Sequence, residues 1–139
     1  GVPFFQTVVT ERTQDFNDSF RKFDAYAVEA SEQTRRLTIP KINPVQNLSS
    51  LLNNWNRKKI ILLCNENDGI PVMKIKNKIS KPVSFLIGPE GGFSGHELEG
   101  FLNFEFVKSI SLGPRILRSD TAAISMVASY QSIFGDWNL

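Results

Sequence analysis

Short apolar runs alternate along the chain with segments whose apolar residues recur at helical spacing. Residues 3–9 are rich in aromatic and β-branched side chains, which predicts a strand. The compact apolar runs 60–64 and 83–87 and the segment 106–112 predict further strands. Apolar runs of this length are typical of strands that are buried in a parallel sheet.

Helical periodicity marks the segments between these strands. The first predicted helix places five apolar residues on one face: Phe16, Phe20, Phe23, Ala27 and Ala30. We expect Pro40 to end it. Residues 48–55 predict a shorter amphipathic helix, and a final helix should run from a Ser119 cap to about Phe134. Strands that alternate with helices indicate the α/β class, with a mostly parallel sheet and flanking helices.

Glycine-rich loops join two of the predicted strands to the helices that follow them. The first loop is residues 88–93, and after it Ser94 and Glu97 form a capping box that predicts a helix start. Because glycines let backbone amides and a helix N-terminus approach a ligand closely, this unit favours a nucleotide-like ligand. The loop is neither a Walker A motif nor a Rossmann fingerprint. A purely structural glycine turn stays open as an alternative.

The second loop, residues 113–118, carries two arginines just before the final helix. Loops between sheet and helix are where α/β folds bind ligands, and arginine is suited to grip a phosphate or a developing oxyanion. Alternatively, Arg115 and Arg118 are surface residues that neutralise Asp120 and Glu90. The residues of the loop alone leave both interpretations open.

Composition narrows the range of cofactors and compartments. A chain of 139 residues with 41% hydrophobic content has the size of one domain. Its single cysteine, Cys64, lies in an apolar run and cannot form an internal disulfide, which fits a reducing cytoplasm. One histidine and one cysteine do not supply a Cys/His metal cluster, and no apolar stretch approaches the ~20 residues of a membrane span. We therefore expect no metal and no membrane partner.

The net charge of the chain gives little information about its binding partners. A formal net charge of +2 does not by itself indicate a nucleic-acid partner. Lys74, Lys76 and Lys78 alternate with apolar residues at strand period, as in an edge strand protected by lysines. A row of lysines that faces RNA is the less favoured alternative.

The two loops together resemble a known family. Residues 87–94 (IGPEGGFS) with Glu97, followed by residues 112–122 (LGPRILRSDTA), are similar to the paired signature of the RsmE-type 16S rRNA uridine-N3 methyltransferases. Upstream, residues 10–13 and 29–33 also resemble family segments, so the resemblance covers essentially the whole chain. Asp120 departs from the family pattern, which usually has glutamate there.

The resemblance implies a SPOUT fold, in which a C-terminal trefoil knot holds S-adenosyl-L-methionine (SAM) in a bent shape. It implies backbone contacts to SAM from the ends of three strands. By position, these contacts come from Leu63, Cys64, Gly88, Pro89, Glu90, Gly91, Leu112, Gly113, Ile116 and Leu117.

The chemistry that the resemblance implies would use the charged residues of both loops. Uridine N3 must lose its proton, and the negative charge then spreads onto the two flanking carbonyl oxygens. Arg115 and Arg118 are the candidates to stabilise this anion or to anchor a phosphate. Glu90 is a candidate proton acceptor, although it could equally cap loop amides. The base stays unassigned.

The implied partners are 16S rRNA in the small ribosomal subunit and a second copy of the chain, with the final helix as a candidate dimer interface. Family members carry an N-terminal PUA-like barrel, so we expect residues 1–139 to be a SPOUT methyltransferase domain truncated at its N-terminus. Two alternatives stay open. The chain could be a dimeric SAM-binding domain with impaired catalysis, or a SPOUT methyltransferase that acts on another RNA.

Overall fold

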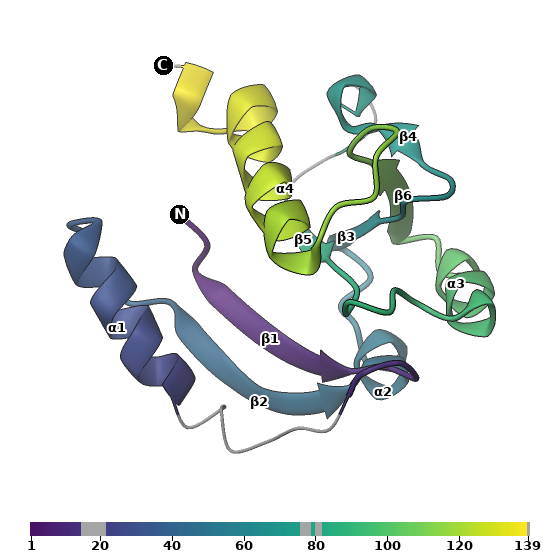
Figure 1. Ribbon diagram of the computed structural model, residues 1–139, viewed down its shortest axis with the longest axis horizontal. Helices are drawn as coiled ribbons and strands as arrows, with labels where there is room; N and C mark the ends of the chain where they lie inside the picture. Colours follow the sequence, from purple (N-terminus) through teal and green to yellow (C-terminus); the bar gives the residue numbers. More distant parts are fainter. Residues whose placement is uncertain (15–21, 76–78, 80–81, 139) are drawn as a thin grey trace. The chain divides into compact units, whose positions relative to one another are not determined.

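The computed structural model describes residues 1–14, 22–75, 79 and 82–138 (Figure 1). The chain forms two compact units, Gly1–Asn54 and Trp55–Leu139. Within the described residues, no helix combines the length and apolar character needed to cross a membrane.

The first unit is built on a parallel pair of strands, β1 (Phe4–Val9) and β2 (Lys41–Asn47). The predicted first strand is confirmed, whereas β2 was not predicted because Pro44 lies inside it and proline is rare within strands. The pairing shifts from Gln6 opposite Asn43 to Val8 opposite Gln46, so β2 bulges by one residue at Pro44. The Gln6 side-chain amide donates to the Pro44 carbonyl at 2.6 Å. The bulge thus accommodates the proline.

Helix α1 (Phe23–Gln33) runs alongside this strand pair and ends earlier than predicted (Figure 1). The expected end at Pro40 is wrong because Arg35 adopts a left-handed backbone conformation with a φ of 53°. The amides of Arg35 and Arg36 then donate to the carbonyls of Glu32 and Ser31 at 3.1 and 2.9 Å. This is the Schellman arrangement that closes helices.

The buried face of α1 also differs from the prediction. Ala27 is buried as expected, but Ala30 is exposed and Ser31 is buried in its place. The Ser31 hydroxyl can be buried because it donates to the Ala27 carbonyl at 2.7 Å. Phe16 and Phe20 lie outside the described residues.

The short helix α2 (Leu48–Asn53) ends this unit and confirms the second predicted helix. Leu48 and Leu52 are almost fully buried. The Asn47 side chain caps the helix by accepting the Ser50 amide at 3.1 Å.

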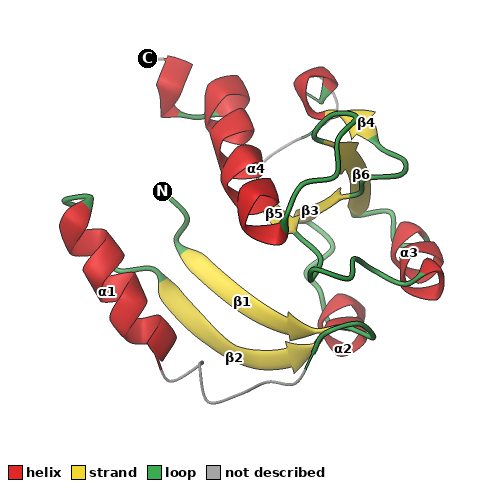
Figure 2. Cartoon of the chain, in the orientation of Figure 1, coloured by secondary structure: helices red, strands yellow, loops and turns green. Residues whose placement is uncertain are grey.

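The second unit contains a parallel sheet in the order β4-β6-β3-β5, which confirms the predicted α/β class (Figure 2). The strands are β3 (Ile60–Cys64), β4 (Ile70–Pro71), β5 (Val83–Leu86) and β6 (Val107–Ser111). Their helices are α3 (Gly95–Leu102) and α4 (Ser119–Phe134), with the 3-10 turns η2 (Val72–Lys74) and η3 (Asp136–Asn138). The predicted strand limits hold to within a residue or two.

Central strand β3 is buried on both of its faces. Successive strand residues point to opposite sides of a sheet, and both Leu62 and Leu63 are 0% exposed. On one side, a buried cluster joins the sheet to η2 and α4: Leu62, Val72, Ile75, Ile110, Met126 and Ile133. Helix α4 therefore covers one face of the sheet.

The prediction that the lysine row lies in an edge strand is wrong for the part of the row that the structure describes. Lys74 lies in the turn η2, and Lys76 and Lys78 lie outside the described residues. Ile75, which directly follows this turn, is buried in the core with 1% exposure. The short strand β4 precedes this turn and pairs with β6.

Substitutions of the two methionines test whether burial of Met126 holds α4 to the sheet. Met126 on α4 is 0% exposed, whereas Met73 is 68% exposed. We expect Met126→Ala to lower the free energy of unfolding by about 2–5 kcal/mol, because it leaves a cavity in the core. Met73→Ala should change it by less than about 0.5 kcal/mol. Urea unfolding measures both, and equal losses would contradict this description of the core.

Candidate ligand-binding pocket

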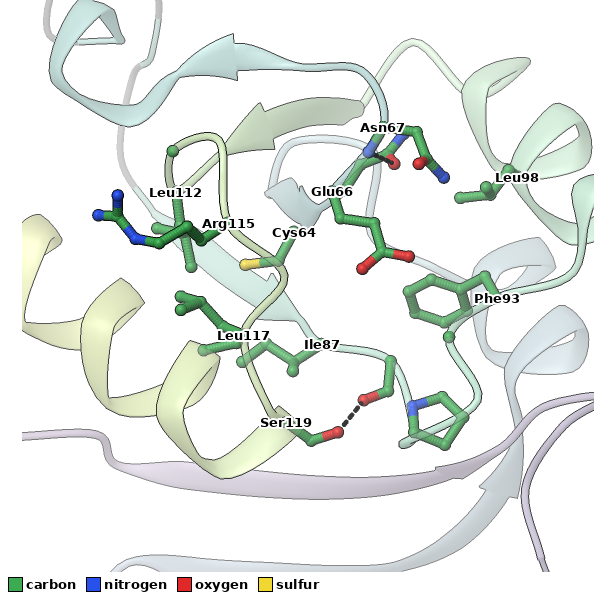
Figure 3. Close-up of a pocket in the computed structure, with 16 residues that line it drawn as sticks. Cys64, Glu66, Asn67, Ile87, Phe93, Leu98, Leu112, Arg115, Leu117 and Ser119 are labelled. Carbon is green, nitrogen blue, oxygen red and sulfur yellow. Dashed lines mark hydrogen bonds between the residues drawn. The ribbon is translucent and has the colours of Figure 1, made fainter.

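A pocket lies in the second unit at the carboxyl ends of β3, β5 and β6 (Figure 3). Parallel strands end at a common edge, and α/β sheets bind ligands there. The lining residues are Cys64, Asn65, Glu66, Asn67, Ile87, Gly88, Pro89, Gly92, Phe93, Leu98, Leu112, Gly113, Arg115, Leu117, Ser119 and Ala122. Both glycine loops thus contribute to one site.

The first loop is closed by Phe93. A Cβ atom at Gly88 would lie 3.1 Å from the Phe93 ring, so glycine permits this close approach. The Phe93 ring packs edge-on against Phe101 of α3, with the ring centroids 5.3 Å apart. The Gly92 amide donates to the Pro89 carbonyl at 2.8 Å. The loop is therefore a packed turn.

The predicted capping box after this loop is confirmed. The Ser94 hydroxyl accepts the Glu97 amide at 3.0 Å, and the Glu97 carboxylate accepts the Ser94 amide at 2.9 Å. Glu97 is only 8% exposed. The box fixes where α3 begins, and with it the end of the first loop.

Ser119 connects the two loops. We expected Ser119 to cap α4, but the N-cap residue is Arg118 and its side chain makes no capping hydrogen bond. Ser119 is instead the first helical residue, and its hydroxyl donates to the Gly88 carbonyl at 2.9 Å, across 31 residues of sequence (Figure 3). The predicted cap is wrong because this hydroxyl is used across the pocket.

The two arginines of the second loop lie in different surroundings. Arg115 is exposed and lines the pocket, and its side chain extends away from Glu66 (Figure 3). The Arg118 side chain is 85% exposed and pairs with Asp120 at 3.4 Å. Hydrogen bonds from the Thr121 amide and hydroxyl lower the pKa of Asp120, and Arg118 contributes less. An ion pair this exposed contributes little stability.

Cys64 forms part of the pocket wall as a neutral thiol. Burial raises its pKa from 9.0 to about 12. Thiolates are the nucleophilic form of cysteine, so at neutral pH this side chain serves as a small apolar group.

The structure brings together seven of the predicted site residues around the pocket: Cys64, Gly88, Pro89, Leu112, Gly113, Arg115 and Leu117. Five others do not line it: Leu63, Glu90, Gly91, Ile116 and Arg118. Leu63 is fully buried, whereas Glu90, Gly91 and Ile116 are exposed. The functional roles of all these residues stay predictions.

Sequence reasoning missed the residues that directly follow β3. Asn65, Glu66 and Asn67 all line the pocket. The rule that parallel strands present their carboxyl ends at one edge would have found them, because they occupy the first positions after a predicted buried strand.

Comparison with known proteins identifies the protein family to which the chain belongs. A family model described as RNA methyltransferase domain matches residues 1–131. The chain therefore belongs to the RNA methyltransferase domain family, and its α/β fold with a pocket at the strand ends agrees with this assignment.

Individual relatives of the chain give a narrower description than the family model does. The chain is 31% identical to ribosomal RNA small subunit methyltransferase E of Rickettsia conorii over 129 residues, which covers 92% of this chain and 53% of the relative. It is 37% identical to the protein of that name from Buchnera aphidicola subsp. Schizaphis graminum over 111 residues, covering 78% and 44%.

A solved structure extends this similarity to the fold. The crystal structure of ribosomal RNA small subunit methyltransferase E from Neisseria gonorrhoeae, bound to S-adenosyl methionine, matches with a TM-score of 0.85 at 27% identity. The match covers 95% of this chain and 55% of that protein. The chain spans about half the length of the curated relatives it matches. The expected N-terminal truncation stays a prediction.

The Ser119 contact can be tested against a second serine of the same helix. We expect Ser119→Ala to lower the free energy of unfolding by about 0.5–1.5 kcal/mol, because the hydrogen bond to Gly88 is lost. Ser125→Ala, at an interior position of the same helix, removes a hydroxyl that does not line the pocket and serves as the reference variant. Denaturant unfolding of both variants measures the loss, and equal stability would exclude a stabilising contact.

Proposed function

We propose that this chain is the catalytic domain of a SAM-dependent methyltransferase that modifies N3 of a uridine in 16S rRNA of the small ribosomal subunit. The observation that carries the proposal is the pocket built from both signature loops, in a chain that matches a SAM-bound relative over 95% of its length. Action on the ribosome implies a cytoplasmic location. The C-terminal trefoil knot belongs to the same proposal.

The residues of the pocket fit SAM. Ile87, Leu112 and Leu117 offer an apolar wall that suits a flat adenine ring, and Asn65 and Asn67 add polar groups to the same lining. When bound, SAM supplies a methyl group on a positively charged sulfur. Of the set expected from the sequence, we propose as SAM contacts the members that line the pocket: Cys64, Gly88, Pro89, Leu112, Gly113 and Leu117.

Arg115 is the first candidate to stabilise the substrate. The uridine ring becomes negative on its carbonyl oxygens as N3 loses its proton, and a guanidinium near those oxygens lowers the energy of this anion. Arg115 lines the pocket and its side chain is exposed, so its cation is accessible to a substrate at the pocket edge. The ion pair with Asp120 partly neutralises Arg118, which makes Arg118 the weaker candidate to stabilise the anion. Its exposed side chain keeps it a candidate contact for a phosphate. Glu90 is exposed outside the pocket lining, and the proton acceptor stays unassigned.

We also propose that the chain works as a homodimer through α4. Ile124 on this helix is 72% exposed, which is unusual for a large aliphatic side chain in the middle of a helix. Small residues such as Ala123 and Ala128 would let a second helix approach closely. Association would remove Ile124 from water.

The central test combines cofactor binding with methyl transfer. We expect calorimetry to detect binding of SAM to the chain, and labelled SAM to methylate N3 of a uridine in small subunits that lack this modification. Arg115→Ala should lower the transfer rate on the order of 100-fold, because one stabilising cation is lost, while SAM still binds. Mass spectrometry of the RNA locates the methyl group.

Arg57→Ala is the matched control, because it removes an exposed arginine that does not line the pocket. It should leave transfer unchanged. SAM binding without transfer to any RNA would favour a binding domain with impaired catalysis, and methylation confined to another RNA would correct the substrate. A chain that does not bind SAM would refute the proposal.

The dimer has its own test. We expect sedimentation velocity to show a dimer, and Ile124→Glu to raise its dissociation constant at least about tenfold, because a carboxylate would be buried at the contact. Glu105→Gln, an exposed change in the loop before β6, is the control. A monomeric parent chain would exclude this assembly.

A further inference from the structure

The loop that follows β3 is fastened to β6 at several points. The Asn65 amide donates to the Ile110 carbonyl at 3.0 Å, and the Ser109 hydroxyl donates to the Asp68 carbonyl. At Gly69, a Cβ atom would lie 2.5 Å from the carbonyl carbon of Ile110, so the backbones are in direct contact. The loop is therefore held against the neighbouring strand along its length.

Asn65 also shapes this loop from within. It is 8% exposed, and its side-chain oxygen accepts the Asn67 amide at 3.1 Å. Such a turn fixes the backbone of the residue between its ends. That residue is Glu66, so the backbone from which the Glu66 side chain extends is well defined.

Glu66 directs a carboxylate into the pocket. Figure 3 shows its side chain reaching into the space between Cys64 and Phe93, while Arg115 extends away from it. Among the described residues that line the pocket, Glu66 carries the one carboxylate. A negative charge therefore faces the ligand space.

The apolar residues around this carboxylate carry no competing charge. Ile87 and Phe93 line the same pocket with apolar side chains, and Cys64 adds a thiol that is neutral at physiological pH. Glu66 itself is exposed, so water and salt screen its charge and its attraction for a cation is modest. Such a site attracts a cationic ligand and offers no comparable attraction to a neutral ligand of the same shape.

We propose that Glu66 is a specificity-determining residue that makes the pocket prefer the sulfonium cation of SAM to the neutral thioether S-adenosylhomocysteine. This inference rests on the proposed function. In the transfer, the bond between sulfur and the methyl carbon breaks and its electron pair stays on sulfur. The methyl group bonds to N3 of uridine, and the N3 proton leaves to solvent. The cofactor thereby loses the charge that Glu66 attracts, which favours release of the spent product.

The test compares three ligands on the intact chain by calorimetry. SAM carries a sulfonium, sinefungin carries an ammonium in its place, and S-adenosylhomocysteine is neutral there. Glu66→Gln keeps the shape of the side chain and removes its charge. We expect it to weaken both cationic ligands about three- to tenfold, with S-adenosylhomocysteine unchanged. Raising the salt concentration should shrink the preference of the parent chain.

Glu105→Gln provides the charge-matched control, because it removes an exposed carboxylate that does not line the pocket. It should leave all three affinities unchanged. An equal loss for all three ligands in Glu66→Gln would overturn the inference, because it would mean that Glu66 binds a part that they share. An unaltered preference would also overturn it. Failure of the parent chain to bind any of the three would refute the proposed function itself.

Discussion

Burial of β3 on both faces is the constraint on which the second unit depends. A strand without a solvated face must be flanked by other strands and covered above and below, which β5, β6 and α4 help to provide. With its sides occupied, β3 meets ligands only at its carboxyl end. Cys64 and the loop after it lie there, beside the two glycine loops. The packing of Leu62 and Leu63 thus determines where the pocket can form.

The pocket depends in turn on contacts between segments that are distant in sequence. Ser119 holds the first loop to the start of α4 through the Gly88 carbonyl, and Asn65 holds the loop after β3 to β6. Each contact uses a polar side chain or amide that is partly or fully buried, where a missing partner is costly. A ligand between these loops would meet surfaces already in place, which lowers the entropic cost of binding.

The fold class and most elements of the second unit could be predicted from the sequence, because compact apolar runs such as 60–64 and the Ser94–Glu97 capping box are local signals. Strand β2 could not, since Pro44 argues against a strand and only pairing with β1 explains the bulge that accommodates it. The left-handed Arg35 that ends α1 has no signal in its residue type. Ser119 was misassigned for a related reason: its partner, Gly88, is distant in the chain.

The protonated state of Cys64 has a consequence for the durability of the pocket. Peroxides attack thiolates, and a thiol whose pKa is raised to about 12 offers almost none at neutral pH. Oxidation of this sulfur would place a polar group on the apolar wall and obstruct the ligand space. Desolvation of the strand end therefore does more than shape the cavity. It also makes Cys64 a poor target for peroxides at neutral pH.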